Sequence, residues 1–127
     1  MGVVRIEAEI GASNDSLKKV EFMVDTGAFY TMLPPAICDE LGLVLNLRER
    51  VVTADNRRLT IELGAELGAA HMKIDGHEGG ILVGKMSVPW PLLGVSALES
   101  LGLKVNPVEG TLEPTRPFGE SPALGTP

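Results

Sequence analysis

The feature that most constrains the fold of this chain is an apolar segment that runs directly into Asp25-Thr26-Gly27-Ala28. Apolar residues recur at every second position from Val20 to Val24, which is the spacing of a strand with one buried face. Asp25 therefore follows directly on a strand, and Gly27 allows the backbone to turn sharply. Because it is costly to desolvate a carboxylate, Asp25 is the first candidate for a functional residue. An ordinary Asp-Gly turn after a strand is the alternative.

A second motif, Leu92-Leu93-Gly94, places two apolar residues before a glycine, and we expect a helix directly after it. Ser96–Glu99 has the spacing of a capping box, and Gly102 is typical of a helix end. In the first half of the chain, Pro34-Pro35 predicts the start of a short helix that Gly42 ends. The two helix ends are similar in sequence. This similarity indicates an internal repeat, with a chance recurrence of Leu-Gly-Leu as the alternative.

Alternating apolar residues and turn residues predict a mainly β chain. We expect strands at 4–10, 17–24, 31–33, 43–47, 50–53, 59–62, 69–75, 81–83, 103–105 and 108–112. The turn between the strands at 69–75 and 81–83 is expected to contain Gly76 and Gly79-Gly80. Residues 114–127 hold four prolines and few apolar residues, which predicts a flexible tail. With this tail set aside, we expect one domain over residues 1–113.

Composition argues against several classes of function. The 127 residues suffice for one domain, whereas two catalytic halves in one chain would need more residues. Seventeen acidic and eleven basic residues give a net charge of −6, which argues against a nucleic acid or an anionic membrane as partner. No apolar run approaches membrane-spanning length, and the amino terminus lacks a targeting segment. Together with the single Cys38, which cannot form an internal disulfide, these features predict a soluble cytoplasmic protein.

Four potential metal ligands, His71, Asp75, His77 and Glu78, occur close together in the sequence. We expect them on the polar face of one strand and in its turn, and no second ligand cluster lies elsewhere in the sequence. They are therefore expected to be solvated, and we expect no metal and no other cofactor.

The combination of Asp25-Thr26-Gly27-Ala28 with a downstream Leu92-Leu93-Gly94 resembles the retropepsin family, the retroviral-type aspartic proteases and their single-domain bacterial and archaeal relatives. The resemblance covers about Val3 to Glu113. It implies an all-β fold, namely a closed, mostly antiparallel retropepsin-like barrel with one or two short helices and a flap hairpin. An internal pseudo-twofold repeat is also what a retropepsin subunit would have.

The resemblance further implies an aspartic endopeptidase that is active as a homodimer and acts on a peptide or protein substrate. Hydrolysis by carboxylates needs two of them close together, and they share one proton because like charges at that distance cannot both ionise. This chain carries one Asp-Thr-Gly, so a symmetric dimer would supply Asp25 twice. Thr26 would join the two turns through hydroxyl hydrogen bonds, and Gly27 would let backbone approach the substrate. Ala28 lacks the hydroxyl with which a Ser would stabilise the ionised carboxylate, so we expect a mildly acidic optimum.

Two further regions of the site follow from the resemblance. The substrate pocket would contain Phe29, Tyr30, Leu92 and Leu93, although the two aromatic residues are nearly as typical of a core, and Trp90 is interpreted as a packing residue. The flap would contain Thr53, Ala54, Asp55, Asn56 and Arg57, and its tip lacks the glycines of viral flaps. A plain surface hairpin is the alternative.

The chain also departs from the viral pattern. Phe29 and Val95 stand where viral enzymes usually carry an Asp and an Arg that pair near the dimer interface, so dimerisation must depend on other contacts. The alternative function is a retropepsin-like dimer that binds peptides or scaffolds a partner without cleaving them. Since Asp25 to Ala28 are all present, nothing in the sequence indicates an inactive enzyme.

Overall fold

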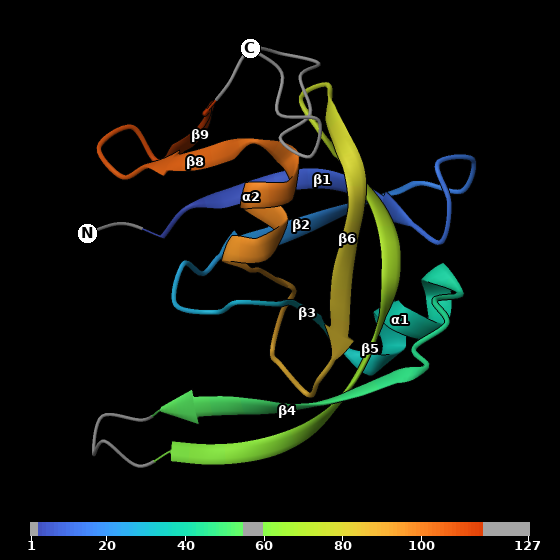
Figure 1. The fold of residues 1–127 in the computed structure, drawn as a ribbon. Coiled ribbons are helices and arrows are strands. Elements are labelled where there is room, and N and C mark those ends of the chain that lie inside the picture. Colours follow the sequence, from blue (N-terminus) through green and yellow to red (C-terminus); the bar gives the residue numbers. More distant parts are fainter. Residues whose placement is uncertain (1–2, 55–59, 116–127) are drawn as a thin grey trace, which may run out of the picture.

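The fold of the chain is a closed barrel of short strands that carries two helices (Figure 1). The computed structural model describes residues 3–54 and 60–115, and for residues 49–54 and 60–65 it describes the backbone alone. The elements are β1 (Arg5–Gly11), β2 (Lys18–Val24), β3 (Thr31–Leu33), α1 (Pro35–Leu41), β4 (Leu47–Ala54), β5 (Thr60–Ile74), β6 (His77–Lys85), β7 (Leu92–Leu93), α2 (Val95–Leu101), β8 (Leu103–Asn106) and β9 (Thr111–Pro114).

The barrel closes because β5 pairs with two other strands as well as with β4. The strand order is β1-β2-β7-β3-β6-β5, and β5 also pairs with β1, with Ile10 opposite Met72. The pairings β2–β7 and β3–β6 are parallel, and the remaining pairings among the described strands are antiparallel. The expected all-β, mostly antiparallel closed barrel with short helices is therefore confirmed.

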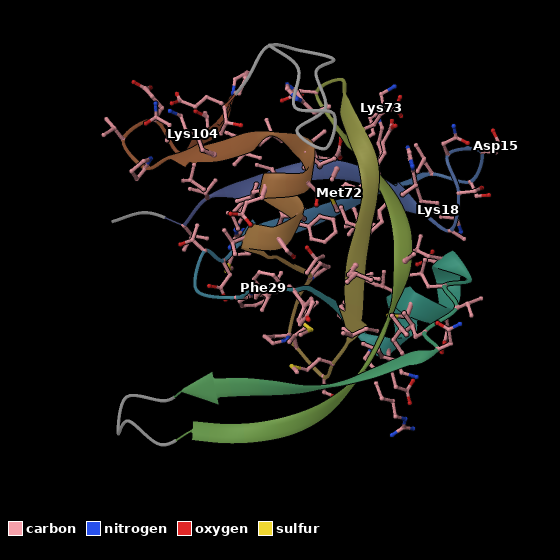
Figure 2. The ribbon with its side chains drawn as sticks, in the orientation of Figure 1. Asp15, Lys18, Phe29, Met72, Lys73 and Lys104 are labelled. Carbon is pink, nitrogen blue, oxygen red and sulfur yellow. The ribbon has the colours of Figure 1, made fainter. Side chains whose placement is uncertain are left out.

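The core fills the barrel and continues under both helices. Alternation along β1 and β2 buries Ala8, Ile10 and Phe22. Met72 of β5 lies in the interior, as Figure 2 shows, and it joins the same cluster as Cys38 of α1. Packing of apolar strand faces against one another explains why the predicted strand periodicity holds here.

The longest strand, β5, belongs both to the barrel and to a two-stranded arm. Its residues from Glu66 to Ile74 pair with β6, whereas Thr60 to Leu67 pair with β4. The β4–β5 pair therefore extends beyond the barrel as a two-stranded arm, which is visible at the bottom of Figure 1. The sequence had predicted two separate strands, at 59–62 and 69–75, and this division is wrong.

Two other predictions about the strands are also wrong. Residues 43–46 form no strand, because Leu43 and Leu45 pack on the core cluster without pairing. The turn before β6 consists of Asp75 and Gly76 alone, at φ 47° and 82°, whereas Gly79-Gly80 lie within β6. Positive φ at both central residues is the geometry of a two-residue hairpin turn.

The last strand begins later than predicted. Asn106 Oδ1 accepts hydrogen bonds from the backbone N–H groups of Val108 and Glu109, both at 3.1 Å. These bonds hold residues 107–110 in a turn that precedes β9, so the strand expected at 108–112 instead spans Thr111–Pro114. The rest of the predicted tail, residues 116–127, lies outside the described residues.

The two helices are alike at their carboxyl ends and different at their starts. Gly42 and Gly102 both adopt the left-handed conformation, at φ 66° and 73°, as the repeat predicts. The capping box predicted for Ser96 is wrong, because the N-cap is Gly94 and Ser96 lies within α2. Neither helix in residues 3–54 and 60–115 is long and apolar enough to cross a membrane.

Candidate active site

Asp25 is positioned by the strand that precedes it and by a neighbouring strand from the far half of the chain. β2 pairs in parallel with β7, with Val24 opposite Leu93. Directly after β2, the backbone N–H of Asp25 donates a hydrogen bond to the Leu93 carbonyl oxygen, with an N···O distance of 2.9 Å. The position of Asp25 is thus fixed by backbone pairing.

The turn after Asp25 holds the carboxylate by its own backbone. The N–H of Ala28 donates to the Asp25 carbonyl oxygen at 3.1 Å, and the N–H of Gly27 donates to Asp25 Oδ1 at 3.0 Å. Asp25 is half-buried, whereas Thr26 and Gly27 are exposed. The carboxylate therefore has one oriented oxygen and lies close to the protein surface.

Gly27 leaves space near the carboxylate. Its φ is not positive, so the sharp backbone turn predicted from the sequence does not depend on glycine for conformational reasons. A Cβ atom at residue 27 would lie 3.3 Å from Asp25 Oδ1, which is a tight contact. The absent side chain gives room to the carboxylate oxygen that the Gly27 N–H holds.

The two sequence motifs meet at the start of α2. The Ala28 carbonyl accepts from the N–H of Val95 at 2.8 Å, and the Phe29 carbonyl accepts from the N–H of Ser96 at 2.9 Å. Ser96 Oγ also donates to the Phe29 carbonyl, at 2.5 Å. The first N–H groups of a helix have no partner within it, and here the loop after Asp25 supplies their acceptors.

Gly94 allows this close approach, and Thr31 completes it. A Cβ atom at residue 94 would lie 2.5 Å from the backbone carbon and oxygen of Tyr30. The N–H of Gly94 donates to Oγ1 of Thr31, which is fully buried, at 3.1 Å. Sequence reasoning did not identify Thr31 as a supporting residue, although a lone hydroxyl in a strand that is otherwise apolar is a usable signal.

A hollow of about 470 Å³ lies beside Asp25 and Thr26. Its other lining residues are all apolar and come from the chain start, from β2, and from β8 and the turn after it: Val3, Val4, Met23, Val24, Val105 and Pro107. Asp25 is the one charged residue in this lining. The carboxylate therefore lies at the edge of an uncharged, open apolar surface.

The predicted pocket residues separate into two groups. Phe29 and Tyr30 line a second hollow, of about 380 Å³, together with Ile81, Leu82 and Ser96 among others. The two aromatic rings contact edge to face, with centroids 4.9 Å apart, and Phe29 is 58 % exposed. Because Phe29, labelled in Figure 2, is exposed, it is not a core residue.

Leu92 and Leu93, the other two predicted pocket residues, lie in β7 between β2 and β3. Leu92 is half-buried, whereas Leu93 is fully buried in the core cluster. The role of Leu93 in this chain is to accept the Asp25 N–H and to fill the core. Leu93 therefore belongs to the core and not to the proposed pocket.

Trp90 is more exposed than its interpretation as a packing residue implies. Its side chain is 48 % exposed, and its Nε1–H donates to Met23 Sδ at 3.3 Å. Met23 lies in β2, two positions before Asp25, and both residues line the hollow beside Asp25. With Arg5 and Glu21, Trp90 and Met23 line a third hollow, of about 240 Å³. The sequence contained no periodic signal for this placement.

The predicted flap is only partly described. Thr53 and Ala54 end β4, where they pair with Ile61 and Thr60 of β5. Asp55, Asn56 and Arg57 lie outside the described residues. The strands that carry the flap form the arm beyond the barrel, on the side of the loop that follows Asp25 (Figure 1).

The two histidines have partners away from Asp25. His71 Nε2 lies 3.2 Å from Glu78 Oε2, and His77 Nδ1 lies 3.0 Å from the Leu101 carbonyl oxygen. Within the described residues, no group of three or more His, Cys, Asp or Glu side chains has the arrangement of a metal site. Burial raises the pKa of the Cys38 thiol, which points to a packing role.

Comparison with known proteins agrees with this geometry. A search of curated proteins finds no match to this chain. A family model described as aspartyl protease matches residues 6–80, which is more than half of the chain and includes Asp25 to Ala28. The match ends before Leu92-Leu93-Gly94, so the contact between the two motifs is an observation that does not depend on the family match. The chain therefore belongs to the retropepsin-like aspartyl proteases.

Proposed function

We propose that the protein is an aspartic endopeptidase that works as a homodimer, with one Asp25 from each subunit in a shared catalytic site. The observation that carries the proposal is the position of Asp25, half-buried at the edge of an open apolar surface with Oδ1 held by the Gly27 N–H. One chain contributes one such carboxylate, and acid–base hydrolysis of a peptide needs two. A twofold axis beside Asp25 would bring the second.

The proposed mechanism uses the two carboxylates as one unit that shares a proton. The ionised carboxylate takes a proton from a water molecule, whose oxygen attacks the carbonyl carbon of the scissile bond. The protonated carboxyl donates its proton to the carbonyl oxygen. When the tetrahedral intermediate collapses, the carboxyl that took the water proton donates it to the leaving nitrogen, the other carboxylate takes a proton from a hydroxyl group of the intermediate, and the C–N bond breaks. Neither carboxylate forms a covalent bond with the substrate.

The surrounding residues have supporting roles in this proposal. Thr26 is exposed next to Asp25, where its hydroxyl could bond to the partner's turn. Ala28 leaves the carboxylate without a hydroxyl donor from its own side chain, which favours a mildly acidic optimum. Phe29, Tyr30 and the half-buried Leu92 are the proposed substrate contacts, and the exposed aromatic ring favours apolar substrate side chains.

The β4–β5 arm is the proposed flap, with Thr53 to Arg57 as its tip. Two observations support this role. Among the described strands, residues 60–65 of β5 pair with β4 alone, and the arm lies on the side of the barrel that carries the loop after Asp25. A two-stranded arm of this kind has few tertiary contacts, which suits a segment that moves over a substrate. A domain limited to residues 1–113 and a cytoplasmic location stay predictions.

The test compares wild type with Asp25→Asn on a diverse peptide library at mildly acidic pH, with dimer content measured by sedimentation. Asp15→Asn is the matched control, because Asp15 lies in the exposed β1–β2 turn on another side of the molecule (Figure 2). We expect wild type and Asp15→Asn to cleave between apolar residues and Asp25→Asn to be inactive while still folded. A well-formed wild-type dimer that cleaves nothing over the whole pH range would instead indicate a peptide-binding module.

A further inference from the structure

We infer that Met23 is a site of oxidation by hydroperoxides, and that the sulfoxide formed there changes the apolar hollow beside Asp25. The effect on peptide cleavage rests on the proposed function, whereas the modification itself does not. Met23 lines two hollows at once, the one beside Asp25 and the smaller one beside Trp90. A small oxidant that enters either hollow therefore meets this side chain.

The surroundings of Met23 differ from those of the other methionines that the structure describes. Met32 and Met72 are buried, at 5 % and 0 % exposure. Met86 is half-buried, as Met23 is, but it lines neither of the two hollows that Met23 lines. Because oxidation of a thioether requires access of the oxidant to the sulfur, we expect Met23 to react ahead of Met32 and Met72.

The Met23 sulfur has a hydrogen-bond donor beside it. Trp90 Nε1–H donates to Met23 Sδ at 3.3 Å, and the Trp90 side chain is 48 % exposed. A thioether sulfur is a weak acceptor, whereas a sulfoxide is a polar group that needs a donor. The indole N–H is in place to donate to the sulfoxide oxygen, which favours the oxidised side chain in the folded protein.

The modification is a two-electron oxygen transfer. A lone pair of the Met23 sulfur attacks the terminal oxygen of the hydroperoxide, so that an S–O bond forms and the O–O bond breaks. The leaving oxygen takes the proton of the transferred oxygen and departs as water or as an alcohol. Sulfur is oxidised to the sulfoxide and the hydroperoxide is reduced.

The backbone around Met23 keeps the new polar group close to Asp25. The N–H of Met23 donates to the Pro91 carbonyl oxygen at 3.0 Å, and Met23 pairs with Leu92 of β7. These bonds do not involve the side chain, so oxidation leaves them intact. The sulfoxide therefore stays two residues before Asp25.

The sulfoxide changes the chemistry of the hollow beside Asp25. Apart from Asp25 and Thr26, the lining of this hollow is apolar. An apolar substrate side chain that packs against a sulfoxide takes a polar group out of water, which costs free energy. Oxidation of Met23 should therefore weaken the binding of apolar substrates and reduce their cleavage.

The experiment treats folded wild type, Met23→Leu and Met86→Leu with dilute hydrogen peroxide. Mass spectrometry of peptides follows the oxidation of each methionine, and Trp90 fluorescence and peptide cleavage are compared with those of the same protein before treatment. Trp90 is the only tryptophan of the chain, so its fluorescence reports on the contact with Met23. Met86→Leu is the matched control because it removes a half-buried methionine that does not line the hollow beside Asp25. Circular dichroism checks that all three proteins stay folded.

We expect Met23 to oxidise at least about tenfold faster than Met32 and Met72. In wild type and in Met86→Leu, Trp90 fluorescence should change and cleavage should fall at the rate of Met23 oxidation. Met23→Leu should keep its fluorescence and its cleavage rate through the same treatment.

The outcomes separate this inference from the proposed function. Equal oxidation rates of Met23, Met32 and Met72 would overturn the inference. Complete oxidation of Met23 that leaves the fluorescence, or the cleavage rate of an active wild type, unchanged would also overturn it. If wild type cleaves no peptide before treatment, but Met23 oxidises first and Trp90 fluorescence follows, the modification site stands and the protease proposal fails.

Discussion

Substitution of Gly94 by Ala should disturb the support of Asp25 more than any other change of one methyl group in this region. The added Cβ atom would lie 2.5 Å from the Tyr30 carbonyl carbon and oxygen and 2.7 Å from the Phe29 carbonyl oxygen. All three are backbone atoms of the loop that follows Asp25, so no side-chain rotation relieves the contact. The loop or the start of α2 must move.

The cost has two parts. Overpacking of this kind typically costs about 1–3 kcal/mol. Movement of the loop also weakens the bonds from Val95 and Ser96 to the Ala28 and Phe29 carbonyls, and each lost hydrogen bond adds about 1 kcal/mol. We therefore expect the free energy of unfolding to fall by about 3 kcal/mol. We also expect the rate of peptide cleavage by the folded variant to fall strongly, because the same segment holds Asp25.

The assay is urea unfolding of wild type, Gly94→Ala and Gly80→Ala at one protomer concentration, since dimerisation makes stability depend on concentration. Gly80→Ala is the control for stability because a Cβ atom there has no neighbour within 4 Å. It should change stability by less than about 1 kcal/mol. A Gly94→Ala variant as stable and as active as wild type would refute the proposed role of the contact between the two motifs.

Four further outcomes are expected. Cys38 should react with thiol reagents only on unfolding, because it is 2 % exposed and burial raises its pKa; labelling at the rate of a free thiol would contradict this. The unfolded thiol loses its proton first as pH rises past the ordinary pKa of 9.0, so between pH 9.0 and 10.5, below the range in which Lys85 titrates, the stability of wild type should decrease more than that of Cys38→Ala, as alkaline unfolding curves would reveal. Thr26→Ala should weaken the dimerisation constant about tenfold, whereas Thr26→Ser should retain it, as measured by sedimentation. Equal dimerisation of the two variants would exclude a role of the Thr26 hydroxyl in the contact. Ser96→Ala should lower the free energy of unfolding by about 1 kcal/mol, since Ser96 Oγ donates to the Phe29 carbonyl, and urea unfolding that is unchanged would argue against that bond.

The sequence was most informative where a local requirement determines the structure. The alternation before Asp25, the proline start of α1 and the glycine ends of both helices depend on neighbouring residues, and all were predicted correctly. The contact between the Asp25 and Gly94 motifs was not predicted, since the two motifs are far apart in the sequence and only the pairing of β2 with β7 brings them together.

Predictions failed where a distant segment decides the outcome. The sequence of β5 predicts two strands, but pairing first with β4 and then with β6 makes β5 continuous. Ser96 has the spacing of a capping residue, but β7 fixes the helix start at Val95, and the Ser96 hydroxyl bonds to Phe29 instead. The hollow beside Asp25 combines Val3 with Val105, and no local pattern could indicate that they meet.

The most direct test of the central claim, that Asp25 from two subunits forms one site, is a mixing experiment. Wild type and Asp25→Asn are mixed in varying ratios at constant total protein, allowed to exchange subunits, and assayed on a peptide that wild type cleaves. If both carboxylates are required, activity follows the square of the wild-type fraction, so an equal mixture retains about one quarter of the activity. A linear decrease, with about one half retained in the equal mixture, would mean that each Asp25 acts alone and would contradict the shared site.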